Sequence, residues 1–399
     1  MCTPCGLRSV IKILEIVNEV FDNQLGKIPS YVTVENWIKK LGLDVYQDDK
    51  PRGTKLARVG AIIDEGISVF HQKLLVLLEI PAEHLGRPLQ HKDVVVRAME
   101  VSDKHTGEDV KNLIEKTESA YDTTFEYVVN DQGRNLVSGV NASNKVEHYD
   151  ISHYLGNCMR HVYSKDDDFN GLISHFGDLR LRYQLTEKST LVPPNMRTIA
   201  RFMNVDKWIY WANDRLMQYN VLDKESQEAL ACIPQNRELI TELKKGVDAI
   251  RKVETIFKHE GMSLRTLSLA HKTIVDDLII KGQSGSRRLG LEMLEYVNHE
   301  YEQMQGCTDV INNSSDIIES NFGIWKSKTS PNKQCGITSF ILTIPLYPMV
   351  AERGAAKTFN FKERLCNTKM KDVAAWSNLN TPHQWATNKN ISTQKQSQN

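Results

Sequence analysis

The sequence lacks any long hydrophobic run. Its longest apolar stretches, 74–78 and 340–346, fall far short of the roughly 20 residues that a membrane-spanning helix needs. Its start is not typical of a signal peptide either, because Asn18, Glu19 and Asp22 interrupt the first apolar stretch and no small-residue cleavage site follows. We therefore expect no contact with a membrane and a cytoplasmic location.

An excess of charge of either sign is also missing, since 50 basic residues balance 50 acidic ones. This balance argues against a globally basic nucleic-acid-binding protein, although affinity for phosphate depends on local patches. One such patch is segment 326–376, which holds nine Lys or Arg against three Asp or Glu. The segment is either a solvated face or a contact for DNA.

Closely spaced cysteine pairs are almost absent. The chain has seven cysteines, and only Cys2 and Cys5 have the spacing of half a zinc site. No second pair lies nearby to complete four ligands, so free thiols in a reducing compartment are the favoured interpretation and structural zinc is the alternative.

Apolar residues at three-to-four spacing predict an amphipathic helix over 7–22. After a turn, a second helix is predicted over 33–42, with Thr33 as N-cap and Gly42 as C-cap. The two helices together fit a helix-turn-helix that reads a DNA groove. A helical hairpin without DNA contact fits the same pattern.

Beyond residue 56 the pattern changes to short apolar runs. The predicted order is three strands at 57–64, 72–80 and 93–101, a helix at 107–121, a strand at 125–130, a helical turn, a strand at 145–149 and a helix at 151–162. The first three strands would pair as an antiparallel meander, and the later ones would join through right-handed crossovers. This order predicts an α/β protein with an RNase H-like mixed sheet.

The remaining chain is predicted to be mostly helical, with long helices over 198–219, 237–259, 264–281 and 290–304 and a loop at 282–286. The domain prediction is an N-terminal helical segment, a catalytic core in two parts separated by a large all-α insertion, and a disordered tail: 1–56, 57–164 and 311–378, 165–310, and 379–399.

Three acids occupy places where this fold brings carboxylates together. Asp64 ends the first predicted strand, Asp131 follows the fourth, and Glu319 lies on a predicted helix from 316 to about 327. Two-metal phosphodiester cleavage needs carboxylates from separate segments that converge on cations about 3.5–4 Å apart. Each acid alone has another interpretation: a hairpin turn, a cap, and a solvated helix pair with Lys326.

Several other side chains are candidates for supporting roles. Lys326 lies two helical turns after Glu319 and could contact phosphate, as could Lys328, Lys39 and Lys40. Asp316 is an alternative ligand or a helix-start acid. Asp150 and His153 open a predicted helix, where Asp is a common N-cap, although both could lie near the site and orient water or a ligand.

Four segments carry a family resemblance: VNDQGRNLVSGV, HYDISHYLGNCMRHVY, LVPPNMRTIARFMNVDKWIYWA and SSDIIESNFGIWKSK. They resemble bacterial insertion-sequence transposases of the DDE class, over roughly residues 57–345. In that class the first Asp lies on the first strand, the second follows the fourth, and the Glu lies on a helix beyond an insertion. The resemblance assigns these roles to Asp64, Asp131 and Glu319, with Lys326 as the basic residue that often follows the Glu.

The resemblance implies a metal-dependent nuclease and strand transferase that uses Mg²⁺ or Mn²⁺, with two ions expected. Its partners would be double-stranded DNA, both transposon terminal inverted repeats and target DNA, and a second copy of the chain in a homodimer. Its location would be the bacterial cytoplasm, associated with the nucleoid. Two alternatives remain open: a catalytically inactive DNA-binding protein of transposase descent, and another RNase H-like nuclease.

Overall fold

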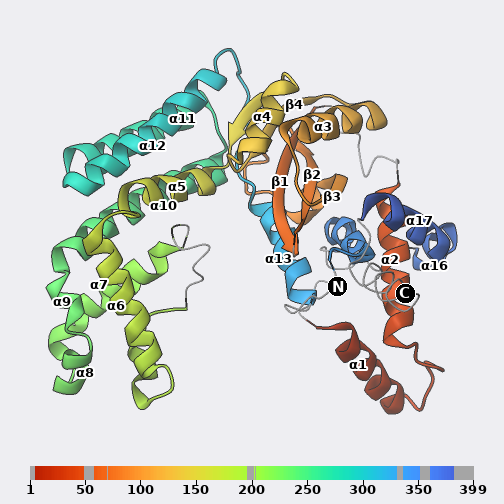
Figure 1. Ribbon diagram of the computed structural model, residues 1–399, viewed down its shortest axis with the longest axis horizontal. Coiled ribbons are helices and arrows are strands. Elements are labelled where there is room, and N and C mark those ends of the chain that lie inside the picture. Colours follow the sequence, from red (N-terminus) through yellow and green to blue (C-terminus); the bar gives the residue numbers. More distant parts are fainter. Residues whose placement is uncertain are drawn as a thin grey trace, which may run out of the picture. The chain divides into compact units, whose positions relative to one another are not determined.

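The computed structural model describes residues 5–48, 58–69, 71–195, 202, 204–329, 336–350 and 360–381. It is a mixed α/β protein that divides into two compact units (Figure 1). We call residues 1–85, 89–147 and 315–399 the sheet unit, and residues 86–88 and 148–314 the helical unit.

A five-stranded mixed sheet has the strand order β3-β2-β1-β4-β5. The strands are β1 (Val59–Val69), β2 (Gln72–Pro81), β3 (Val95–Ser102), β4 (Phe125–Asn130) and β5 (Val146–Tyr149). The antiparallel pairs β1–β2 and β2–β3 form the predicted meander, whereas β4 pairs with β1 in parallel. The predicted order of strands and helices in this part of the chain is confirmed.

One face of the sheet packs on α3 (Gly107–Tyr121) and α4 (Arg134–Ala142). Strands β1 and β2 are apolar on both faces, as strands in the middle of a covered sheet are expected to be. Ala61 and Ile63 of β1 belong to the same buried cluster as Val110 and Ile114 of α3. Because side chains alternate along a strand, Ile62 and Asp64 point to the opposite face.

The rest of the sheet unit is helical. Its elements are α1 (Leu7–Val20), α2 (Tyr31–Tyr46), η1 (His91–Asp93), α13 (Asp316–Lys328), η6 (Ser339–Leu346), α14 (Tyr347–Val350), α16 (Phe361–Asn367) and α17 (Met370–Asn380). Helix α13 runs beside β1 (Figure 1), and α2 packs against η6, α16 and α17.

Helix α2 is longer than predicted at both ends. Ser30 is its N-cap, and its hydroxyl accepts a hydrogen bond from the amide of Thr33. The prediction of Gly42 as a C-cap was wrong, because Gly42 lies inside the helix where the backbone of η6 approaches closely. A Cβ at this position would lie 1.9 Å from the carbonyl oxygen of Leu342.

Between residues 150 and 314 the described elements are all helices, apart from one isolated bridge between Met262 and Ile311. They are α5 (Ile151–Tyr163), α6 (Asp167–Tyr183), η2 (Glu187–Leu191), α7 (Val205–Gln218), η4 (Tyr219–Val221), α8 (Lys224–Ala229), α9 (Cys232–Gln235), α10 (Arg237–Glu260), α11 (Leu264–Ile274), η5 (Val275–Ile280) and α12 (Ser284–Gln303).

Two predictions in this unit differ in detail from the structure. The helix predicted over 264–281 changes to a π-helix at Val275. Helix α12 starts at Ser284, inside the predicted loop 282–286. A carboxylate from a distant helix explains the earlier start, because Glu242 of α10 accepts a hydrogen bond from the amide of Ser286 at 2.7 Å.

Three predictions fall on residues outside the described ranges: the zinc ligand Cys2, the start of the helix at residue 198, and residues 382–399 of the tail. Residues 379 and 380, which the prediction assigned to that tail, form the end of α17. None of the helices in the described part of the chain is both long and apolar enough to cross a membrane.

Candidate functional site

Asp64 lies inside β1 and is 6% exposed. The prediction that the strand ends at this acid was wrong, because β1 continues to Val69 through a register shift between Asp64 and Ile67. The sequence Glu65-Gly66 resembles a turn, but Gly66 is needed here for packing. A Cβ on Gly66 would lie 2.2 Å from the ring of Phe322 in α13.

Asp131 directly follows β4, as predicted, and is half-buried. Its carboxylate accepts a hydrogen bond from the amide of Gly133 at 2.9 Å, and Gln132 between them has a φ of +67°. The side chain of Asn130 accepts a second bond from the amide of Gln132 at 2.9 Å. These bonds fix the turn that joins β4 to α4, so the backbone position of Asp131 is well defined.

The parallel register between β1 and β4 relates these two acids. Ile62 is paired with Val129, and Asp64 and Asp131 each lie two positions further along their strands. A step of two residues keeps a side chain on the same face, so both acids point away from α3 and α4. The fold therefore places Asp64 and Asp131 level with each other on neighbouring strands, on the same face of the sheet.

Glu319 lies on α13, which packs on this face, and it is half-buried. Two contacts hold the helix against β1: Phe322 packs at Gly66, and the amine of Lys326 donates a hydrogen bond to the carbonyl oxygen of Gly66 at 2.7 Å. Glu319 lies one helical turn before Phe322, about 4.5 Å along the helix axis. Helix α13 thus carries Glu319 past the strand that bears Asp64.

The three acids suit a hard divalent cation, because Mg²⁺ prefers carboxylate oxygens. Asp64 is nearly buried, and a cation beside it would offset the cost of removing its charge from water. Within the part of the chain that the structure describes, no group of three or more His, Cys, Asp or Glu side chains is arranged to hold a metal ion. The three carboxylates are carried by adjoining elements: β1, the turn after β4, and α13.

The predicted DNA-binding lysines of α2 have contacts within the protein. Lys39 pairs with Glu35 one turn earlier, at 2.5 Å, and the amine of Lys40 donates a hydrogen bond to the carbonyl oxygen of Leu365 in α16. Arg364 of α16 also pairs with Asp44 of α2 at 2.7 Å and with Asp48, just after that helix, at 2.8 Å. The second half of α2 is therefore tied to the C-terminal helix α16.

Lys328 lies near the end of α13 and lines a pocket of about 480 Å³. Arg8 of α1 and Tyr31 of α2 line the same pocket, with the guanidinium carbon of Arg8 4.9 Å from the centre of the Tyr31 ring. The pocket therefore has two basic side chains, Arg8 and Lys328, and one acidic side chain, Glu35, in a lining that is otherwise mainly apolar.

Asp150 and His153 belong to the helical unit. Asp150 is fully buried and is the N-cap of α5, as the capping interpretation predicts. Its carboxylate accepts a hydrogen bond from the amide of His153 at 2.7 Å and lies 2.9 Å from Nδ1 of the same residue. These contacts give Asp150 a structural role at the start of the helix.

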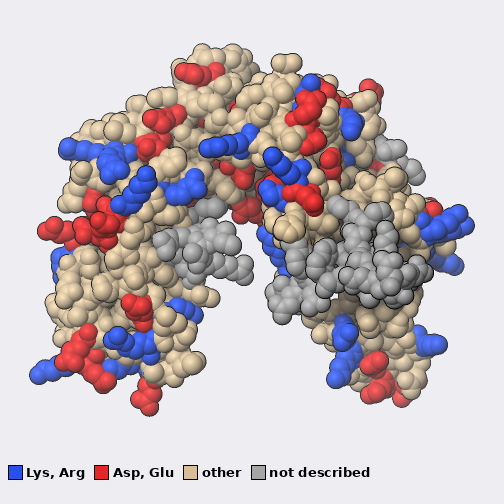
Figure 2. Space-filling view, viewed as in Figure 1, with Lys and Arg blue, Asp and Glu red and all other residues tan. Residues whose placement is uncertain are grey.

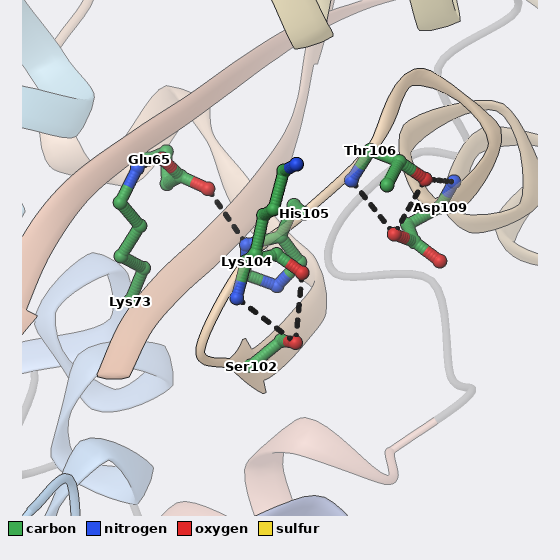
Figure 3. Close-up of polar contacts among 7 residues, drawn as sticks. All are labelled: Glu65, Lys73, Ser102, Lys104, His105, Thr106 and Asp109. Atoms are coloured by element: carbon green, nitrogen blue, oxygen red, sulfur yellow. Dashed lines mark hydrogen bonds and ion pairs between the residues drawn. The ribbon is translucent and has the colours of Figure 1, made fainter. Parts of the chain in front are cut away.

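A polar cluster around Glu65, the residue after Asp64, is not predicted by the sequence. Oε1 of Glu65 lies 2.7 Å from Nδ1 of His105, and Lys73 of β2 also pairs with Glu65 (Figure 3). His105 is 3% exposed, and its Nε2 has no hydrogen-bond partner among the described residues. The nearest signal in the sequence is the capping box of Thr106 and Asp109, which defines the start of α3 directly after His105 (Figure 3).

The surface charge is mixed. On the face drawn in Figure 2, Lys and Arg side chains are interspersed with Asp and Glu. Local contacts, more than a broad basic field, would therefore have to position a nucleic acid. The sequence matches no protein-family model and no curated protein.

Proposed function

We propose that this protein is a DDE-type DNA transposase, with Asp64 and Asp131 on an RNase H-like sheet and Glu319 on the helix packed beside it as the metal-holding acids. One observation carries the proposal. Asp64 on the central strand and Asp131 after its parallel neighbour share one face and one edge of the sheet, and α13 brings Glu319 to that face. The family resemblance of the surrounding segments supports the same assignment.

The site would act on a phosphodiester bond. Metal ions held by the three carboxylates would supply the activation of water and the stabilisation of the leaving oxygen. The protein itself would position the acids. The register shift in β1 follows Asp64, and the turn at Gly133 orients Asp131. The contact of Phe322 with Gly66 determines where along β1 helix α13 carries Glu319. A freed 3′-hydroxyl held at the same site would then attack target DNA in line.

Lys326 would contribute to DNA binding beside the acids. Its amine uses one donor on the carbonyl oxygen of Gly66, and a lysine ammonium has three donors. The side chain is exposed, so the remaining donors can reach a phosphate oxygen. The contact with Gly66 places this charge next to the strand that carries Asp64.

The proposal is tested by nicking of supercoiled plasmid DNA in Mg²⁺ or Mn²⁺, together with calorimetric titration of Mn²⁺ into the protein. We expect Asp64→Asn, Asp131→Asn and Glu319→Gln each to lower the nicking rate at least about 100-fold, because each removes charge that stabilises the transition state. Each should also weaken Mn²⁺ binding while DNA binding is retained. Asp103→Asn is the matched control, since Asp103 is an exposed acid in the loop before α3.

Three results would contradict the proposal. Full nicking activity in any one of the three variants would remove that acid from the site. Cleavage of an RNA–DNA hybrid in preference to duplex DNA, without strand transfer, would indicate a different nuclease. Binding of DNA by a wild-type protein that never nicks it would indicate the inactive DNA-binding protein.

A further inference from the structure

Helix α1 presents an apolar stripe to solvent. Ile13, Ile16 and Val20 are 50%, 56% and 73% exposed, and their spacing of three and four residues places them on one face of the helix. Phe21, which follows the helix, is 58% exposed. Single exposed apolar residues are common on protein surfaces, but a continuous stripe along a helix marks an interaction surface.

The stripe belongs to an ordered hairpin of α1 and α2. Asn18 is 7% exposed, and its side chain accepts a hydrogen bond from the amide of Leu25 at 2.8 Å and donates one to the carbonyl oxygen of Gly26 at 3.1 Å. These bonds fix the connection between the two helices. Leu7 and Val10, on another side of α1, line the pocket shared with α2 and α13. The exposed stripe is therefore a second apolar surface, separate from the one that holds α1 in the sheet unit.

A charged stripe borders the apolar one. Lys12, Glu15 and Glu19 are spaced three and four residues apart, so they share one side of α1, next to Ile13 and Ile16. The basic residue lies in the N-terminal half of the helix and the two acidic residues in the C-terminal half. A surface of this kind is self-complementary when a second copy approaches in the opposite direction.

We propose that α1 pairs with α1 of a second copy of this chain, antiparallel about a two-fold axis. In this arrangement Ile13 packs against Ile16 of the other copy, and the charged stripes of the two helices face each other. Lys12 then lies opposite Glu19 of the other copy, and the two-fold axis forms this ion pair twice. In a parallel pair, the charged flank of one helix would meet the opposite flank of the other. Lys12 and Glu19 would then face Val10 and Val17.

The size of α1 predicts a modest affinity. The helix has 14 residues, which corresponds to a length of about 21 Å. A contact between two helices of this length is at the small end of specific interfaces, so we expect a dissociation constant of roughly micromolar order. The proposal does not depend on the chemistry of the acidic site.

The test is sedimentation velocity of the full chain between about 1 and 100 µM. We expect a monomer–dimer equilibrium in the wild type and only monomer in Ile16→Glu, which puts a charge in the apolar stripe. Leu181→Glu is the control, because Leu181 is 75% exposed on α6 and lies outside the proposed interface. This control should dimerise like the wild type.

A charge exchange tests the direction of pairing. Lys12→Glu and Glu19→Lys should each be monomeric alone, since like charges then face each other. A mixture of the two variants should form heterodimers, because both facing pairs become attractive. A monomeric wild type at 100 µM, a dimer that survives Ile16→Glu, or a mixture that stays monomeric would each overturn the proposal.

Discussion

Both units of this protein pair a buried histidine with a glutamate, yet they use the pair differently. In the sheet unit, Glu65 contacts His105 and also Lys73, whose side chain is 44% exposed. In the helical unit, His148 and Glu300 are both essentially inaccessible, with Nδ1 of the histidine 2.6 Å from the carboxylate. Glu300 also accepts a hydrogen bond from the amide of Tyr149 at 2.9 Å.

The comparison shows how burial changes the role of the same two groups. A carboxylate with one partner near water can exchange contacts at low cost, whereas a buried one must keep every partner it has. The pair with the partly exposed lysine partner includes Glu65, which follows Asp64, the first acid of the candidate site, in β1. The fully buried pair joins α12 to β5, just before α5. We therefore expect mutations in the two pairs to affect different properties, stability in one case and the site in the other.

The largest effect should come from Glu300→Ala. This change leaves the His148 ring and the Tyr149 amide without the buried carboxylate that they contact. We expect the free energy of unfolding to fall by about 3–5 kcal/mol, the usual cost of removing one partner of a buried pair. Urea denaturation followed by circular dichroism measures it.

Glu302→Ala on the same helix is the control for this experiment. Glu302 is exposed, and its loss should change the free energy of unfolding by less than about 0.5 kcal/mol. If Glu300→Ala were as stable as this control, the buried pair would not hold the helical unit together, and the contrast between the two units would fail.

A glycine-to-alanine exchange should have opposite signs in the two units. In Gly66→Ala the new Cβ would lie 2.2 Å from the ring of Phe322, so α13 must shift from β1. We expect a loss of about 1–3 kcal/mol, as for other overpacked sites. In Gly177→Ala, inside α6, the new Cβ has no neighbour within 4 Å, and we expect a gain of about 0.5–1 kcal/mol.

Thermal unfolding of the two glycine variants distinguishes these outcomes. Gly66→Ala should also lower the nicking rate, because the shift of α13 moves Glu319 relative to Asp64. A destabilised Gly66→Ala that nicks DNA at the wild-type rate would show that the contact of α13 with β1 matters for stability alone.

Two tyrosines give the smallest and most specific comparison. Burial raises the pKa of Tyr46 in the sheet unit to about 12, and burial also raises the pKa of Tyr163 in the helical unit. A phenol with a raised pKa stabilises the fold fully below its unfolded pKa near 10, and the stabilisation is lost as pH rises through the folded pKa. For Tyr46 this window is about pH 10 to 12.

The hydroxyls of these tyrosines differ in their contacts. The Tyr46 oxygen accepts a hydrogen bond from the amide of Met99 at 3.1 Å, whereas the Tyr163 hydroxyl is buried without a partner among the described residues. Tyr46→Phe should therefore cost about 1 kcal/mol at pH 8, and Tyr163→Phe should be neutral or stabilising. Both variants should show a weaker fall in stability between pH 8 and 11 than the wild type.

Urea denaturation at the two pH values checks this pair of variants. Equal losses at pH 8 would mean that the Tyr163 hydroxyl has a partner in solution. An unchanged pH dependence in Tyr46→Phe would mean that this phenol does not resist ionisation in the folded protein.

Local patterns in the sequence predicted the elements that local physics controls. The strand Phe125–Asn130 and the helix Gly107–Tyr121 have the predicted bounds, because alternation, a capping box and helical spacing are all written in neighbouring residues. The place of Asp131 followed directly from the end of that strand. The longer α2 and the earlier start of α12 were not accessible in this way.

The candidate site shows the same division. The sequence Asp64-Glu65 predicts a strand end and a turn, whereas the strand continues because Ile67 and Val69 pair with β2. Phe322, more than 250 residues away along the chain, packs at Gly66 in this continuation. The ion pair of Glu65 with His105 also needs two segments that only the sheet brings together. Its residues carry no motif that would reveal the contact.

By itself the sequence determined the order of strands and helices, the helical character of the long middle segment, and the acids worth testing. Tertiary structure alone decided which face of the sheet Asp64 and Asp131 share and which strand α13 packs on. It also decided which lysines of α2 have partners within the protein. The physical reason is that periodicity and capping depend on neighbours within a few residues, whereas register and packing depend on atoms that are distant in the chain.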